Sequence, residues 1–143
     1  MQDWKSRYDI DFTPLAEFVR NTPQMFLVKP YSARAWQTLS EPVLLADVDL
    51  KTVTNLEINN TTTVTATASG RLDGVLVYFE LELGPTTRFS THPMQVDEHN
   101  HWRSPVWVFS DAFPLQAGES FAVNYTHGLR GTESQVTVSH VGG

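Results

Sequence analysis

Residues 75–83, with the sequence VLVYFELEL, decide the fold class of this chain. The first residues of this run are apolar on both faces, and the last alternate between glutamate and leucine. This pattern is typical of a central strand in a closed or sandwiched sheet. A turn follows at Gly84-Pro85, and a second apolar run, Val-Trp-Val-Phe, returns at residues 106–109. The two runs therefore predict two strands joined by a long loop.

The loop between these strands carries most of the candidate site residues. It holds three of the five histidines, His92, His99 and His101, and it ends on Trp102. Loops longer than ~12–15 residues without secondary structure are uncommon in compact domains, and most are functional or disordered. We therefore expect the sheet to present a site on this loop.

Length and composition narrow the class of protein. The chain has 143 residues and 41% hydrophobic content, which is enough for one domain with its own core. The sequence contains no run of ~18 apolar residues, so it predicts no membrane-spanning helix. The N-terminus lacks the apolar segment of a secretory signal. We therefore expect a cytoplasmic location, or a nuclear one in a eukaryote.

The net charge argues against one class of binding partner, and the absence of cysteine excludes several kinds of site. The formal net charge of −6 argues against nucleic acid as a main partner, because phosphate binding needs clustered Lys and Arg. The same negative charge slightly favours a basic peptide as a binding partner. The chain has no cysteine, which excludes disulfides, thiolate metal sites and a cysteine nucleophile.

The remaining elements are predicted from local patterns. Residues 4–21 are the one helical segment, with Thr13 and Pro14 suited to the N-cap and first helical position. The mixed segment 31–40 is expected to be a connection in which Trp36 is buried. Turn or bulge signals stand at 69–70 and 73–74, and a bend with a glycine turn at 112–119. Further strands are expected at residues 25–28, 42–50, 61–68, 105–109, 121–125 and 135–141.

Short strands at roughly even spacing with one helix indicate a mainly β protein. We predict a single barrel-like antiparallel β domain with one short N-terminal helical arm. Trp107 alternates with valines in its strand, which favours a core position. Asp47 and Asp49 are expected to cap loops and strand ends rather than to act as paired catalytic carboxylates.

Two motifs in the histidine loop carry a family resemblance. Residues 89–93 are Phe-Ser-Thr-His-Pro, and residues 100–103 are Asn-His-Trp-Arg. They resemble the Ser-Thr-x-Pro turn and the Thr-His-Trp loop in the C-terminal β-barrel domain of the protein arginine methyltransferase family. Asn100 stands where the family has threonine. The segment 47–53 resembles the family's acidic-aliphatic segment.

The resemblance extends to the N-terminal segment. Residues 4–15 are similar to the beginning of the family's dimerisation arm, which docks on the AdoMet-binding half of a second subunit. The resemblance thus divides the chain into an arm at 1–24 and a β-barrel domain at 25–143. It implies a homodimer in the parent enzyme.

The same resemblance assigns roles to the loop. The histidine matching His101 lies between the barrel and the catalytic half, pairs with a carboxylate from the N-terminal part of the enzyme, and borders the substrate arginine pocket. Trp102 packs at the same boundary. Asn100, His101 and Trp102 are therefore the candidate substrate-binding residues, and His101 is the candidate catalytic residue. The alternative is that His101 only ties the loop to the barrel.

The chain carries no motif for the cofactor that this family uses. It has neither a GxGxxG-like loop nor a strand–glycine turn–helix unit for S-adenosylmethionine (AdoMet). The family's acidic hairpin, which grips the substrate guanidinium, also has no counterpart. We therefore expect no cofactor-binding residues in this chain and no methyl transfer by the chain alone. AdoMet, an AdoMet-binding catalytic domain and an arginine-containing protein or peptide substrate would belong to the parent enzyme.

Two other interpretations remain open from the residues alone. His99 and His101 form a His-x-His pair near His92, which could bind a metal ion, although no glutamate follows as in cupins. The chain could also be a free-standing β-barrel binding module, for example one that contacts carbohydrate through Trp102. We expect no metal site and favour the methyltransferase interpretation.

Overall fold

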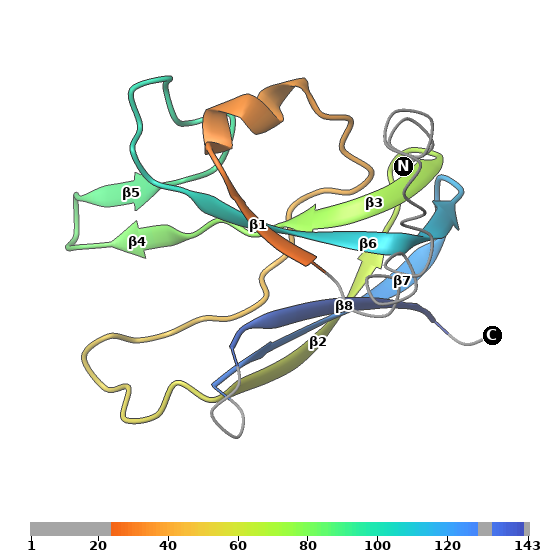
Figure 1. Cartoon of the computed structure of the whole chain (residues 1–143). Coiled ribbons are helices and arrows are strands. Elements are labelled where there is room, and N and C mark those ends of the chain that lie inside the picture. Colours follow the sequence, from red (N-terminus) through yellow and green to blue (C-terminus); the bar gives the residue numbers. More distant parts are fainter. Residues whose placement is uncertain (1–23, 129–132, 142–143) are drawn as a thin grey trace, which may run out of the picture.

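The computed structural model describes residues 24–128 and 133–141, and the fold in this part of the chain is mainly β (Figure 1). Every ladder between its strands is antiparallel. This confirms the predicted fold class. No helix among the described residues has the length and apolar character needed to cross a membrane.

The strands form two three-stranded sheets and a small hairpin. The first sheet has the order β1-β6-β3 and consists of Gln24–Val28, Ser104–Leu115 and Gly70–Leu76. The second has the order β2-β7-β8 and consists of Ile58–Thr65, Ser120–His127 and Gln135–His140. The hairpin pairs β4, Glu80–Glu82, with β5, Arg88–Ser90. A short 3₁₀ helix, η1, spans Pro30–Ala35.

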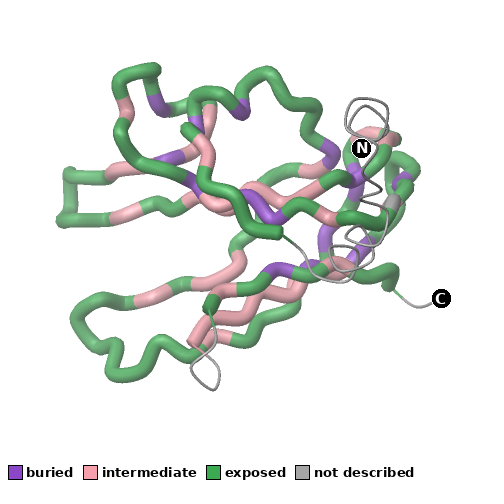
Figure 2. The backbone as a smooth tube through the Cα atoms, in the orientation of Figure 1, coloured by how far each residue is buried: buried purple, intermediate pink, exposed green. Residues whose placement is uncertain are grey.

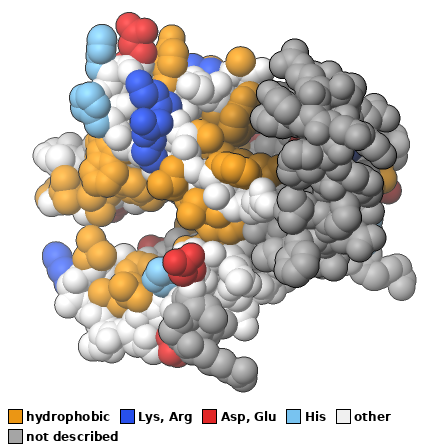
Figure 3. Space-filling view, viewed as in Figure 1, with side chains coloured by type: hydrophobic (Ala, Val, Ile, Leu, Met, Phe, Trp, Pro, Cys, Tyr) orange, Lys and Arg blue, Asp and Glu red, His pale blue; other side chains and the backbone are white. Residues whose placement is uncertain are grey.

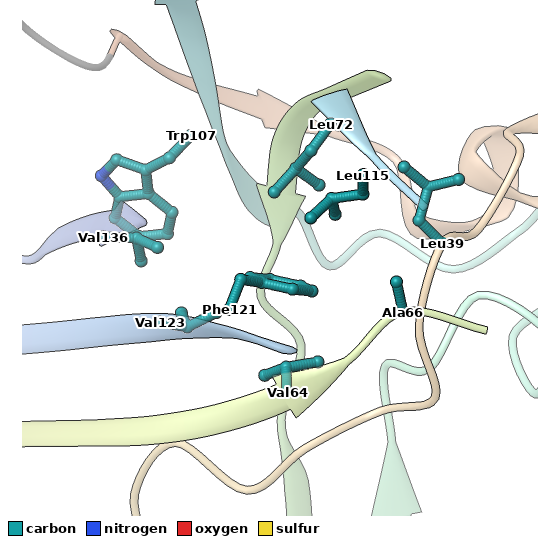
Figure 4. Close-up of a cluster of buried hydrophobic side chains, with 9 residues drawn as sticks. All are labelled: Leu39, Val64, Ala66, Leu72, Trp107, Leu115, Phe121, Val123 and Val136. Atoms are coloured by element: carbon teal, nitrogen blue, oxygen red, sulfur yellow. The ribbon is translucent and has the colours of Figure 1, made fainter. Parts of the chain in front are cut away.

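The core lies between the two three-stranded sheets, where their apolar side chains meet (Figure 4). As predicted, Trp107 of β6 is a core residue, with only 4% of its surface exposed. It is one of nine buried residues in a single cluster: Leu39, Val64, Ala66, Leu72, Trp107, Leu115, Phe121, Val123 and Val136. Figure 2 shows buried positions on strands of both three-stranded sheets, whereas the β4–β5 hairpin is exposed or half-buried.

A bulge separates two parts of the β3–β6 ladder. The register shifts between Leu72 and Gly74, so the bulge signal at 73–74 is confirmed. A Cβ added at Gly74 would lie 2.5 Å from the carbonyl oxygen of Trp107. The glycine thus permits a close backbone approach that no side chain allows.

The predicted strand at 42–50 is wrong, because these residues run beside β2 without forming a ladder with it. Asn60 of β2 donates a side-chain hydrogen bond to the carbonyl of Leu45 at 2.8 Å, and Thr62 donates one to the carbonyl of Leu44 at 3.2 Å. Side chains therefore satisfy the carbonyl oxygens that a backbone ladder would use. The apolar composition of residues 42–50 gives no sign that side chains of β2 bond to these carbonyl oxygens.

The predicted continuous strand at 75–83 is interrupted. β3 ends at Leu76 and β4 begins at Glu80. Between them, Phe79 pairs with Thr91 through both its backbone N–H and its carbonyl oxygen. This pairing turns the chain out of the first sheet and into the hairpin.

Two further expectations need correction. Trp36 is 47% exposed, and Ala33 and Leu39 are buried on either side of it. The bend expected from residue 112 begins later, because β6 continues to Leu115. The glycine turn itself is confirmed at Gly118, whose φ is 89°.

The expected arm at residues 1–24 lies outside the described residues except for Gln24, which begins β1. The arm and the domain boundary after residue 24 therefore stay predictions. The strands predicted at 25–28, 61–68, 105–109, 121–125 and 135–141 are all present, with ends shifted by a few residues.

Candidate functional site

The histidine loop begins at a buried anchor, Thr91. This residue has no exposed surface. Its N–H donates to the carbonyl of Phe79 at 2.9 Å, and its hydroxyl oxygen accepts the N–H of Phe79 at 3.0 Å. Thr91 therefore fixes the point where the loop leaves the β4–β5 hairpin. These hydrogen bonds explain structurally why a threonine stands at this position of the Ser-Thr-x-Pro motif.

Three aromatic rings meet beside this anchor. The ring of Phe79 lies 5.3 Å from that of Trp102 and 5.9 Å from that of Phe89 between centroids. The Phe89 and Trp102 rings are also 5.9 Å apart. These are favourable distances for tilted and edge-to-face aromatic pairs. The cluster thus holds the end of the histidine loop against the hairpin.

The aromatic cluster is open to solvent. Trp102 is 55% exposed and Phe79 is 37% exposed. Figure 3 shows hydrophobic side chains gathered on the hairpin side of the molecule, with histidine and basic side chains next to them. An exposed apolar patch of this kind is a common mark of an interaction surface.

Asn100 has a local conformational role. Its side-chain oxygen accepts the N–H of Trp102 at 2.7 Å, and its own N–H donates to the carbonyl of Asp97 at 3.3 Å. Asp97 in turn accepts the N–H of His99 at 2.9 Å through its carboxylate. Asparagine and aspartate often stabilise tight turns in this way. Asn100 therefore sets the backbone on either side of His101.

His101 is exposed, and no residue in the described part of the chain forms a hydrogen bond, ion pair or ring contact with it. The neighbouring Trp102 is held by the aromatic cluster. His101 is thus available to a group from outside this part of the chain.

The other two histidines of the loop have different surroundings. The ring of His92 is half-buried against the ring of Tyr78, with centroids 4.8 Å apart, and its Nδ1 accepts the N–H of Met94 at 3.1 Å. His99 is exposed and lies 3.7 Å from the carboxylate of Glu98. Within residues 24–128 and 133–141, no three His, Asp or Glu side chains gather in a way that could hold a metal ion.

The hydroxyl of Tyr78, beside the histidine loop, has a shifted pKa. Partial burial, followed by the negative charge of Glu80, raises the pKa of the Tyr78 hydroxyl above its ordinary value. Both effects disfavour the phenolate. Tyr78 therefore keeps its proton throughout the physiological pH range.

The acidic residues Asp47 and Asp49 belong to the segment between η1 and β2. Asp49 accepts the N–H of Lys51 at 2.9 Å through its carboxylate, so it caps a turn. Both aspartates are exposed. This agrees with the structural role that the sequence predicts for Asp49.

Sequence reasoning missed one residue that contacts the loop from a distance. Arg34 of η1 donates to the carbonyl oxygens of Pro93 and Val96, which are 59 and 62 residues away in sequence. No local pattern marks Arg34, because η1 has neither the length nor the periodicity that a sequence analysis would detect. The aromatic partners of Trp102 were also not foreseen, although they lie in the same stretch of sequence.

These features define the class of protein: an antiparallel, mainly β domain with an exposed His-Trp loop beside an aromatic cluster. Residues 1–132 match the family model described as the arginine methyltransferase oligomerization subdomain. The chain therefore belongs to the arginine methyltransferase family as this subdomain. No curated protein matches it.

Proposed function

We propose that this chain forms the C-terminal half of an AdoMet-dependent protein arginine methyltransferase. In this proposal it walls the substrate groove, takes part in homodimerisation and is inactive alone. Its partners are an AdoMet-binding catalytic domain and an arginine-containing protein or peptide. The observation that carries the proposal is the family match over residues 1–132, which includes the whole histidine loop.

The surroundings of His101 and Trp102 support a boundary role. His101 is exposed without a described partner, so a carboxylate from the catalytic domain could accept its N–H and orient its ring. Trp102 and Phe79 offer exposed aromatic surface directly beside it. Covering that surface with a second domain would gain roughly 25 cal/mol for each Å² of apolar area removed from water.

The chemistry also favours a division of labour between two halves. Methyl transfer requires the cofactor and the guanidinium nitrogen to be aligned, and alignment of this kind can supply several kcal/mol of the rate enhancement. AdoMet, when bound to the catalytic domain, supplies the methyl group. The residues of this chain do not fit AdoMet, because the sequence has no glycine-rich loop leading into a helix. In this proposal their part is to shape the groove and to orient the substrate arginine.

Methyl transfer measured with alanine variants tests the role of His101. In the chain combined with its catalytic domain, His101→Ala should lower kcat/KM by about ten- to a hundredfold, or ~1.4–2.7 kcal/mol. His99→Ala is the matched control, because His99 is also exposed and lies two residues away. It should be nearly silent. His92→Ala should likewise leave transfer almost unchanged, although loss of the Tyr78 contact can lower stability.

The isolated chain provides the second arm of the test. Calorimetry with AdoMet should give no stoichiometric binding, and no methyl group should reach a peptide substrate. Stoichiometric AdoMet binding by this chain would contradict the proposed division of labour. Equal losses for all three histidine variants would contradict the boundary role of His101. Activity that survives His101→Ala would support the alternative that His101 only ties the loop to the barrel.

A further inference from the structure

Residues 92–103 are connected to the rest of the described chain by few polar contacts. Their internal hydrogen bonds form short turns, in which the carbonyl of His92 accepts the N–H groups of Gln95 and Val96 at 2.9 and 3.2 Å. Among the described residues, the hydrogen bonds that reach this segment from a distant element both come from Arg34. One side chain of η1 therefore makes both of the long-range hydrogen bonds to this loop.

The guanidinium of Arg34 is suited to hold two points at once. Its Nε donates to the carbonyl of Pro93 at 2.7 Å, and an Nη donates to the carbonyl of Val96. The same group lies 4.6 Å from the centroid of the Tyr31 ring, a distance typical of a cation–π contact. The planar fork of arginine makes both bonds in one rigid geometry, which the single ammonium of lysine cannot reproduce.

The two acceptors of Arg34 enclose the first turn of the loop. Val96 is 5% exposed, so its side chain anchors the same turn from within. The next residue, Asp97, begins the turns that lead through Asn100 to Trp102. A shift of the first turn would therefore be passed along a short chain of hydrogen bonds to His101.

We propose that Arg34 is the positioning residue of the histidine loop, and that its two hydrogen bonds set where Asn100, His101 and Trp102 stand relative to the catalytic domain. This inference rests on the proposed function for its role in the enzyme. The positioning itself can be measured in the chain alone.

Amide hydrogen exchange on the full chain tests the positioning directly. Arg34→Met keeps an apolar stem of similar length but removes both hydrogen bonds. It should speed exchange of the Val96, Asn100 and Trp102 amides on the order of tenfold, because these amides are protected by the turns of the loop. Amides of the β7–β8 ladder should keep their rates. Arg71→Met is the matched control, because Arg71 is an exposed arginine on β3 that pairs with Asp73.

Arg34→Lys separates positioning from a simple effect of charge. It should behave like Arg34→Met if the bidentate geometry matters. Unchanged exchange in the loop, wild-type behaviour of Arg34→Lys, or equal acceleration across the whole domain would each overturn the proposal.

In the enzyme combined with its catalytic domain, Arg34→Met should lower kcat/KM for the protein substrate by about tenfold. The KM for AdoMet should not change, because the loop does not bind the cofactor in this scheme. In the double variant, His101→Ala should cause a smaller loss of activity than it causes in the wild-type enzyme. Both changes act through the same loop, so their effects should not add fully. Fully additive losses, or a changed KM for AdoMet, would overturn the proposal. A wild-type enzyme without methyl transfer would refute the proposed function, while the exchange experiment would still decide the role of Arg34.

Discussion

Gly74→Ala should destabilise this domain through a backbone clash at the bulge between β3 and β6. The added Cβ would lie 2.5 Å from the carbonyl oxygen of Trp107 and 3.3 Å from both the carbonyl carbon of that residue and the Cα of Val108. All three atoms belong to the backbone, so no side-chain rotation relieves the contact. The two strands must move apart, and overpacking of this kind costs about 1–3 kcal/mol.

Two other glycines provide controls of graded severity. An added Cβ at Gly84 meets nothing within 4 Å, so Gly84→Ala should be neutral or stabilising by up to about 0.5 kcal/mol through the unfolded chain. An added Cβ at Gly70 lies 2.9 Å from a methyl group of Leu39, which can rotate away. Gly70→Ala should therefore fall between the other two.

Urea unfolding followed by tryptophan fluorescence measures these differences, because the buried Trp107 lies at the site of the clash. We expect Gly74→Ala to lower the urea midpoint without changing the slope. The thermal midpoint should fall by about 3–9 °C, taking about 3 °C for each kcal/mol in a domain of this size. A Gly74→Ala variant as stable as Gly84→Ala would refute the steric argument and the close approach of the two strands.

Three further predictions concern single features. Ser104 is buried and its hydroxyl has no partner in the described part of the chain, so Ser104→Ala should leave the free energy of unfolding unchanged or raise it by up to about 1 kcal/mol in urea titrations. Thr91→Ala, at an equally buried but hydrogen-bonded hydroxyl, should lower it by about 1–3 kcal/mol; equal effects would contradict this contrast. Because burial and Glu80 raise the pKa of Tyr78, the unfolded chain loses that proton first, and stability should fall as pH rises above about 10. Tyr78→Phe should lessen that fall, and an unaltered pH profile would exclude the effect. Excess zinc should leave the thermal midpoint unchanged. An increase of about 2.7 kcal/mol in the free energy of unfolding, at a hundredfold excess of zinc over Kd, would indicate that the three loop histidines bind metal together.

The sequence by itself determined the fold class and most of the strands. Alternation of apolar and polar residues depends on which face of a sheet is buried, and that information is local. The same reasoning placed Trp107 in the core, and the Asp-Gly pair at residues 73–74 gave a turn or bulge signal that the structure shows as a bulge. The loop motif at residues 100–102 was also visible in the sequence, because the residues of that candidate site are consecutive.

Only the tertiary structure decided which segments lie against one another. The run at 42–50 has the composition of a strand, but side chains of Asn60 and Thr62 bond its carbonyl oxygens, and no ladder forms. Trp36 is exposed although its type favours burial, because the burial of a side chain next to a short 3₁₀ helix depends on what packs there.

The connection between Arg34 and the histidine loop shows the same limit of sequence reasoning. Arg34 is separated from Pro93 by 59 residues, and the chain between them includes β2, β3 and the β4–β5 hairpin. Local propensity and periodicity extend over only a few residues, so they carry no information about this contact. The sequence thus determined the strands and the motif of the loop, whereas the tertiary structure decided that Arg34 of η1 lies beside that loop and bonds to it.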